Sequence, residues 1–182
     1  NSINMADGIN GNSGLIFLIY FLLLYNADNE LNIFSLFVLT SLIIFLFFNL
    51  RNKLYLGDSG IYFVSLLISF YVIREYNFGT SNISCEKIFL IFMIPGLDMF
   101  RLFYKRIYNK KNPFKGDLDH LHHLLMNKFK LSGSLIIYVS LIVWPNIIYN
   151  FFEIKIIILI IMNIIIFSLL IFYLNKLKKF SN

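Results

Sequence analysis

Charged residues are scarce in this sequence. Asp, Glu, Lys and Arg make up 14% of its 182 residues, whereas a soluble globular domain carries about 25%. Apolar residues make up 58%, and the mean hydropathy is +0.73. This balance excludes an ordinary soluble domain and indicates a protein of the membrane class.

Cysteine is almost absent as well, and the single Cys85 excludes an internal disulfide framework. The apolar runs lack the alternation of period two that membrane β-strands show, which favours helices. We interpret the net charge of +6 as a consequence of membrane topology, so no nucleic acid partner is expected.

Six apolar stretches predict an all-α fold, a polytopic membrane helix bundle with about six transmembrane helices. A span needs roughly 20 residues, so the shorter stretches are expected to be completed by their neighbours. No repeat or second domain is visible, so residues 1–182 are predicted to form a single integral membrane domain. Pro95-Gly96 predicts a bend in the fourth stretch. The stretches cover residues 14–25, 32–50, 60–73, 87–104, 134–152 and 154–173.

The basic residues sort by side if the chain crosses the membrane six times. One side receives the N-terminal segment, residues 51–59, residues 105–133 and the C-terminal tail. It holds 13 of the 16 Lys and Arg residues, because only Arg74, Lys87 and Lys155 fall on the other side. The positive-inside rule then predicts that this first side is cytoplasmic.

Three polar segments on that side, residues 1–13, 49–60 and 105–133, are the predicted active-site loops. Each has a plain structural alternative: an Asn/Gly-rich turn for the first and a capped helix N-terminus for Gly57-Asp58-Ser59-Gly60 in the second. The third gathers all three histidines, His120, His122 and His123, behind two aspartates. Such a cluster fits either a zinc site or contact with an anion.

Taken together, the three segments favour phosphoryl-transfer chemistry. Aspartates bind Mg²⁺ through a few carboxylates plus phosphate oxygens. Nearby lysines, arginines and histidines suit an anionic ligand such as a diphosphate, and glycines let the backbone approach phosphates. Positioning and charge neutralisation supply most of the catalysis in such reactions.

Four motifs resemble the polyprenyl-phosphate N-acetylhexosamine-1-phosphate transferases, a group within glycosyltransferase family 4 that is related to the phospho-MurNAc-pentapeptide transferase. They occur in the family's order and cover the chain up to about residue 125. The third contains Asp98, for which a structural ion pair with Arg101 or Lys105 and a functional role both remain open. The motifs are Asn1-x-x-Asn4-Met-x-Asp7-Gly8-Ile-x-Gly11, Leu56-Gly57-Asp58-Ser59-Gly60, Ile94-Pro95-x-x-Asp98-Met99 and Pro113-Phe114-x-x-Asp117-x-x-His120-x-His122-His123.

The resemblance implies transfer of a sugar 1-phosphate, expected to be N-acetylhexosamine 1-phosphate, from a UDP-sugar to undecaprenyl phosphate. Such a step initiates the synthesis of a cell-envelope polysaccharide or lipid-linked glycan. It implies Mg²⁺ as the cofactor, with Mn²⁺ as a substitute. It also implies a multi-pass protein of the plasma (inner) membrane whose active-site loops are cytoplasmic and whose partners are a polyprenyl phosphate lipid and a nucleotide sugar.

The same resemblance implies roles for individual residues. Asp58 is the expected Mg²⁺ ligand, Asn49 is expected to contact the uridine, and the histidines are expected to engage the diphosphate or the sugar. The expected catalytic residues are Asp7, Asp58, His120, His122 and His123. The expected substrate-binding residues are Asn4, Asn10, Asn49, Lys53 and Asp117.

The sequence departs from the family at several positions. Asn10, Ile61 and Leu118 stand where the family usually has Asp, Ser and Arg. The family's Asp-Asp motif lies upstream of the first motif, so we expect this chain to be the C-terminal portion of a larger transferase domain. It is then either a fragment of an active enzyme or an incomplete gene product that cannot catalyse the reaction alone.

Two other classes stay open at this point. A multi-span transporter predicts ionisable residues lining a path within the spans. A membrane metallohydrolase predicts zinc bound by the three histidines with Asp117.

Overall fold

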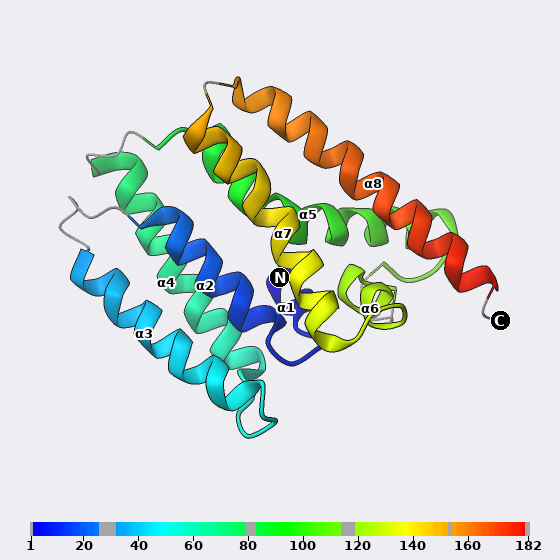
Figure 1. The fold of residues 1–182 in the computed structure, drawn as a ribbon, viewed down its shortest axis with the longest axis horizontal. Helices are drawn as coiled ribbons and strands as arrows, with labels where there is room; N and C mark the ends of the chain where they lie inside the picture. The colour runs from blue at the N-terminus through cyan, green and yellow to red at the C-terminus, as the bar shows by residue number, and fades with distance from the viewer. Residues whose placement is uncertain (1, 26–31, 79–82, 114–118, 153, 181–182) are drawn as a thin grey trace.

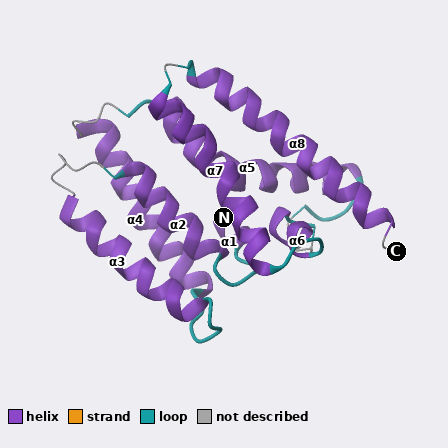
Figure 2. Cartoon of the chain, viewed as in Figure 1, coloured by secondary structure: helices purple, strands orange, loops and turns teal. Residues whose placement is uncertain are grey.

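The computed structural model describes residues 2–25, 32–78, 83–113, 119–152 and 154–180. Over these residues the protein is entirely helical, with eight helices and no strand, as Figure 2 shows. The all-α prediction is therefore confirmed. The helices are α1 (Ser2–Ala6), α2 (Asn12–Leu24), α3 (Asn32–Asn49), α4 (Gly57–Phe78), α5 (Cys85–Tyr108), α6 (Leu121–Met126), α7 (Leu131–Phe151) and α8 (Ile156–Phe180).

The long helices form two neighbouring groups (Figure 1). Helices α2, α3 and α4 lie side by side, and α5, α7 and α8 form the second group, joined to the first by contacts of α2 with α7 and α5. The short helices α1 and α6 lie at the end where α2, α4 and α7 begin and where α3 ends. The described residues 2–13, 49–60 and 119–133 of the three segments predicted to share a side therefore lie near one another at one end of the bundle.

Prolines occur inside two of the long helices. Pro95 lies in α5 and Pro145 in α7, where each removes one backbone hydrogen bond. Figure 1 shows α5 changing direction on its way behind α7, in line with the bend expected near Pro95. Helix α5 starts at a capped end, because Ser84 Oγ accepts a hydrogen bond from the Lys87 backbone N–H at 3.2 Å.

Buried apolar side chains from every helix meet in the interior, including Phe17, Ile61, Ile94 and Leu125. The outward surfaces are also apolar, with bulky exposed residues along α3, α4 and α8. Exposed apolar surface of this extent needs a non-aqueous environment or a partner, because soluble proteins rarely leave large apolar patches in water.

Two helices are long and apolar enough to cross a membrane, within the described residues. They are residues 131–151 of α7 and 156–176 of α8, with mean hydropathies of 1.8 and 3.0. Only 39% and 28% of these windows are buried inside the protein, unlike the core helix of a soluble domain. They are therefore the best candidates for membrane spans.

The other four predicted spans differ from expectation in length or polarity. Helix α2 has 13 residues and is about 20 Å long, whereas the hydrocarbon core of a bilayer is about 30 Å thick. Helix α3 is apolar, but its apolar segment is also short of the required length. Helices α4 and α5 are longer, yet each carries charged residues along its course, such as Glu75 and Asp98.

Candidate active site

The first part of the site is the turn between α1 and α2, which carries Asp7. The side chain of Asn12 donates to the backbone oxygen of Ala6 at 2.7 Å, and Ser13 Oγ donates to Asp7 Oδ1 at 2.5 Å. Gly11 adopts a φ of +86°, a left-handed conformation that glycine accepts without strain. These contacts make the turn compact and fix the direction of the Asp7 carboxylate.

The second part is the segment between α3 and α4, which is tied to that turn by Asn49. Asn49 Oδ1 accepts from the Gly11 backbone N–H at 2.6 Å, and Asn49 Nδ2 donates to the Leu54 backbone oxygen at 2.7 Å. The side chains of Asn10 and Asn52 are also hydrogen-bonded to each other. Asn49 thus joins the two loops, and its expected contact with uridine stays a prediction.

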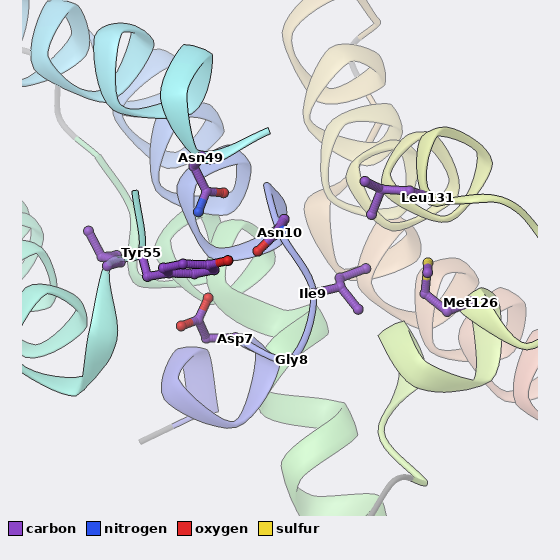
Figure 3. A pocket seen from close by; sticks show the side chains of 9 residues that line it. Asp7, Gly8, Ile9, Asn10, Asn49, Tyr55, Met126 and Leu131 are labelled. Atoms are coloured by element: carbon purple, nitrogen blue, oxygen red, sulfur yellow. The ribbon is translucent and has the colours of Figure 1, made fainter. Parts of the chain in front are cut away.

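A pocket of about 420 Å³ lies between these loops and the α6–α7 connection. Figure 3 shows the ring of Tyr55 lying between the side chains of Asp7 and Asn49. The volume falls in the range of roughly 300–1,000 Å³ typical of small-molecule sites. The lining residues are Asp7, Gly8, Ile9, Asn10, Asn49, Tyr55, Leu56, Met126 and Leu131.

The third part is the histidine segment at the start of α6, which packs on the same turn. A Cβ atom placed on Gly8 would lie 2.0 Å from His122 Nε2 and 2.7 Å from His123 Nε2, so only glycine fits against these rings. The ring of His122 also stacks on His120, with centroids 5.8 Å apart and planes 12° apart. The segments around residues 8 and 122, far apart in sequence, are therefore in direct contact.

His122 is the most unusual of the three histidines. It is 1% exposed, and neither ring nitrogen has a hydrogen-bond partner among the described residues. Burial, together with the neighbouring His123 and His120 rings, lowers the pKa of His122 from 6.5 to about 3 against the weaker opposing effect of Asp98. The ring is therefore neutral at physiological pH, and its two nitrogens keep hydrogen-bonding capacity that no described residue uses.

The remaining predicted residues lie around this centre with less contact. Asn4 Nδ2 donates to Tyr62 OH at 3.4 Å, which links α1 to α4. Asp58 lies in the first turn of α4 and is exposed, as is Lys53. Neither of the two lines the pocket. Asp117 lies outside the described residues.

Mg²⁺ and Zn²⁺ need different donor groups. No group of three or more His, Cys, Asp or Glu side chains that could hold a metal occurs among the described residues. Mg²⁺ does not need such a group, because it is usually held by one or two carboxylates, phosphate oxygens and water. The exposed Asp58 carboxylate fits that mode. The zinc alternative includes Asp117, which lies outside the described residues.

Sequence reasoning did not single out Tyr55. Its signal was an aromatic side chain in the loop between two apolar runs, three residues before Asp58. Tyr55 is 69% exposed despite its position in the pocket wall, so its ring presents a flat surface that a ligand can cover.

Comparison with known proteins supports a relation to one family of membrane transferases. Residues 1–75 match the sequence profile of glycosyl transferase family 4. This match, which covers the first 75 of 182 residues, and the relatives described next confirm the resemblance drawn from the motifs as distant homology.

The relatives make the class more specific. The chain is 27% identical over 136 residues to an undecaprenyl-phosphate alpha-N-acetylglucosaminyl 1-phosphate transferase of Escherichia coli (strain K12), and equally to one of Yersinia pestis. That alignment covers 69% of this chain and 37% of each relative. A protein of the same name from Pasteurella multocida (strain Pm70) is 32% identical over 83 residues, covering 43% of this chain and 22% of the relative.

The chain therefore spans little more than a third of the length of the curated relatives it matches. No solved structure matches it significantly.

Proposed function

We propose that this chain contributes the active-site loops of a membrane enzyme that transfers N-acetylhexosamine 1-phosphate from a UDP-sugar to undecaprenyl phosphate. In this proposal the loops face the cytoplasm and the product initiates a cell-envelope or lipid-linked glycan. Support comes from the family match over residues 1–75 and from relatives whose names state this reaction for N-acetylglucosamine.

The observation that carries the proposal is the meeting of three distant polar segments at one pocket. Residues 7–10, Asn49 with Tyr55 and Leu56, and Met126 with Leu131 line it, and the histidine segment packs against Gly8. Such a site offers acidic, amide, aromatic and imidazole groups within one small region. That mixture suits a nucleotide diphosphate sugar better than it suits an apolar ligand or a single ion.

We assign roles to one residue of the pocket wall, Tyr55, and to two residues outside the wall, His122 and Lys53. The exposed Tyr55 ring suits stacking with a nucleobase. The buried, unpartnered nitrogens of His122 suit polar contact with the diphosphate or the sugar. Lys53 supplies a positive charge on the loop that leads to Asp58, where it would counter phosphate charge.

A second hollow, between α1, α4 and α5, suits the lipid. It measures about 350 Å³ and is lined by residues of α1, α4 and α5: Ser2, Ile3, Ser65, Ile68, Ser69, Val72, Ile73 and Phe92. An isoprenoid chain in this apolar groove would bring its phosphate toward α1, which leads directly into Asp7. The groove also agrees with a membrane position for α4 and α5, which completes the six-span arrangement in our proposal.

The reaction requires one phosphoryl substitution. A phosphate oxygen of undecaprenyl phosphate forms a bond to the sugar-bearing phosphorus of the UDP-sugar, the bridging P–O bond breaks, and UMP leaves with that oxygen. Bound Mg²⁺ would neutralise diphosphate charge, and Asp58 is the residue proposed to hold it. Asp7, held by Ser13, and the three histidines would orient the diphosphate for this in-line substitution.

The test is release of UMP, with transfer of labelled sugar to lipid, by the full-length protein in membranes given Mg²⁺ and undecaprenyl phosphate. UDP-N-acetylglucosamine and UDP-N-acetylgalactosamine are compared as donors. Wild-type protein should release UMP in proportion to lipid labelling, and Asp58→Asn should lose at least 10²-fold in rate, as expected for removal of an electrostatic group from a phosphoryl-transfer site. Glu86→Gln, an exposed acid in α5, is the control. Full transfer by Asp58→Asn would overturn the metal role.

A further inference from the structure

Asp98 is a buried carboxylate whose function the pocket does not explain. It lies in α5 and is 3% exposed. Its Oδ1 accepts from Arg101 Nη2 at 2.6 Å and Nε at 3.2 Å, and its Oδ2 contacts His120 Nδ1 at 3.0 Å and the Leu121 backbone N–H at 3.0 Å. Burying a charge is costly, and an apolar side chain often serves stability as well or better. A carboxylate with both oxygens committed this way therefore suggests a specific task.

The contacts of Asp98 converge on the backbone that leads into α6. Arg101 Nη2 also donates to the Asp119 backbone oxygen at 2.7 Å, and Lys105 Nζ pairs with Asp119 Oδ2 at 2.5 Å. Positions 98, 101 and 105 are three and four residues apart, so they share one face of α5. Side chains on that face make hydrogen bonds or ion pairs with each of the residues 119–121.

The start of α6 lacks the usual cap made by its own residues. His120 occupies the N-cap position, and its side chain makes no cap hydrogen bond. The first N–H groups of a helix need an acceptor, and here Asp98 provides one to Leu121 from a neighbouring helix. The His120 ring is thereby free to turn toward α5 and stack on His122.

The contact also determines which nitrogen of His120 remains available. A carboxylate only accepts hydrogen bonds, so the proton of His120 must sit on Nδ1 for the 3.0 Å contact to be a hydrogen bond. The other nitrogen, Nε2, is then the one that can meet a ligand. Because His120 stacks on His122, and His122 contacts Gly8, the direction of this ring is coupled to the pocket turn.

We propose that Asp98 is a positioning residue of the transfer site, which reserves the Nδ1–H of His120 for itself and leaves Nε2 to accept a hydrogen bond from a hydroxyl group of the sugar substrate. This inference rests on the proposed function for the identity of the ligand. The structural ion pair and the functional role considered for Asp98 are thus the same interaction, because Arg101 holds the carboxylate that orients His120.

The first experiment needs no turnover. The full chain with ¹⁵N-labelled histidine is studied by NMR in detergent micelles, with His120→Gln used to assign the signals. Wild-type protein should show His120 protonated at Nδ1. Asp98→Asn and Asp98→Ala should lose this single state, because an amide can donate to Nδ1 and alanine offers no partner. An unchanged Nδ1–H signal in both variants would overturn the proposal.

The second experiment is a double-mutant cycle on UMP release. Asp98→Asn should lower kcat by about 10- to 100-fold, the usual effect of removing a group that orients a functional histidine, with little change in KM for the UDP-sugar. Combined with His120→Gln, it should cause no further loss, since Asp98 acts through that ring. Losses that multiply would contradict the proposal. Glu86→Gln on the same helix is the matched control and should change neither readout.

The two experiments separate the two proposals. If the wild-type protein transfers no sugar phosphate from either donor, the proposed function fails, and the NMR result alone decides whether Asp98 sets the state of His120. If the wild-type protein is active and the His120 signals do not depend on Asp98, the positioning role fails and the proposed function stands.

Discussion

Replacing Gly8 with alanine tests the contact on which the site depends. The added Cβ would lie 2.0 Å from His122 Nε2, so the ring or the turn must move by about 1.4 Å to reach an ordinary contact of 3.4 Å. Neither is free to do so. His122 is almost fully buried, and hydrogen bonds of Asn12 and Asn49 hold the turn on both sides of Gly8.

The expected magnitude follows from this geometry. Overpacking of a well-packed site costs about 1–3 kcal/mol, and a displacement of about 1 Å at reacting groups lowers rates by about 10²-fold. We therefore expect Gly8→Ala to lower the free energy of unfolding by about 1–3 kcal/mol and the rate of UMP release by about 10²-fold. Both are measured on purified protein in detergent, by denaturant unfolding and by a coupled UMP assay.

Two variants make the Gly8 experiment specific. Gly96→Ala is the matched control, because its Cβ would meet nothing within 4 Å and alanine favours a helix by up to about 1 kcal/mol over glycine. In Gly8→Ala combined with His122→Ala the clash is removed, so the two stability losses should couple by at least about 1 kcal/mol. Wild-type stability and rate in Gly8→Ala alone would refute the reasoning.

Three further predictions follow from the same contacts. Asn49→Ala leaves the Gly11 N–H and the Leu54 oxygen without their partner, which should lower the free energy of unfolding by about 2–4 kcal/mol; a loss below 0.5 kcal/mol would contradict the tie between the loops. Asp58→Asn should change the free energy of unfolding by less than about 0.5 kcal/mol, because Asp58 is exposed, while the rate of UMP release falls. A loss of folding stability that accounts for the lower rate would make the role of Asp58 structural. The pKa of His122 is lowered from 6.5 to about 3, so the unfolded chain takes up a proton between these pH values and the folded chain does not. Protonation of His122 therefore does not affect the free energy of unfolding above about pH 6.5, and it lowers that free energy by about 1.4 kcal/mol per pH unit below this value. Denaturant unfolding from pH 7 to 4 should show this slope, and the His122→Asn variant should lack it.

Several features of the fold could be predicted because they depend on local sequence. The apolar run over residues 32–50 corresponds closely to α3, and the run over 134–152 overlaps all but the first turn of α7 (Leu131–Phe151). The number of membrane spans was harder to predict from the sequence, because it depends on where each helix begins and ends. The apolar run at 14–25 yields a helix of 13 residues, and its polar flank folds into the pocket turn.

The candidate site was predictable in its parts. Clusters of Asp, Gly, Asn and His in an apolar chain indicated the three loops, since such residues are rarely placed in a membrane protein without a task. Their mutual contacts were not predictable, because side chains at positions such as 8 and 122 are brought together only by the packing of α6 and the turn on the same end of the bundle.

The sequence by itself determined the helical, apolar character of this protein, its family resemblance and the residue types of its site, because composition, periodicity and motif order are local properties of the chain. Only the tertiary structure decided that Asn49 joins two loops, that Tyr55 forms a pocket wall and that Asp98 contacts His120. Each of these depends on hydrogen-bond direction and burial between segments that are separated in sequence, which no single stretch encodes.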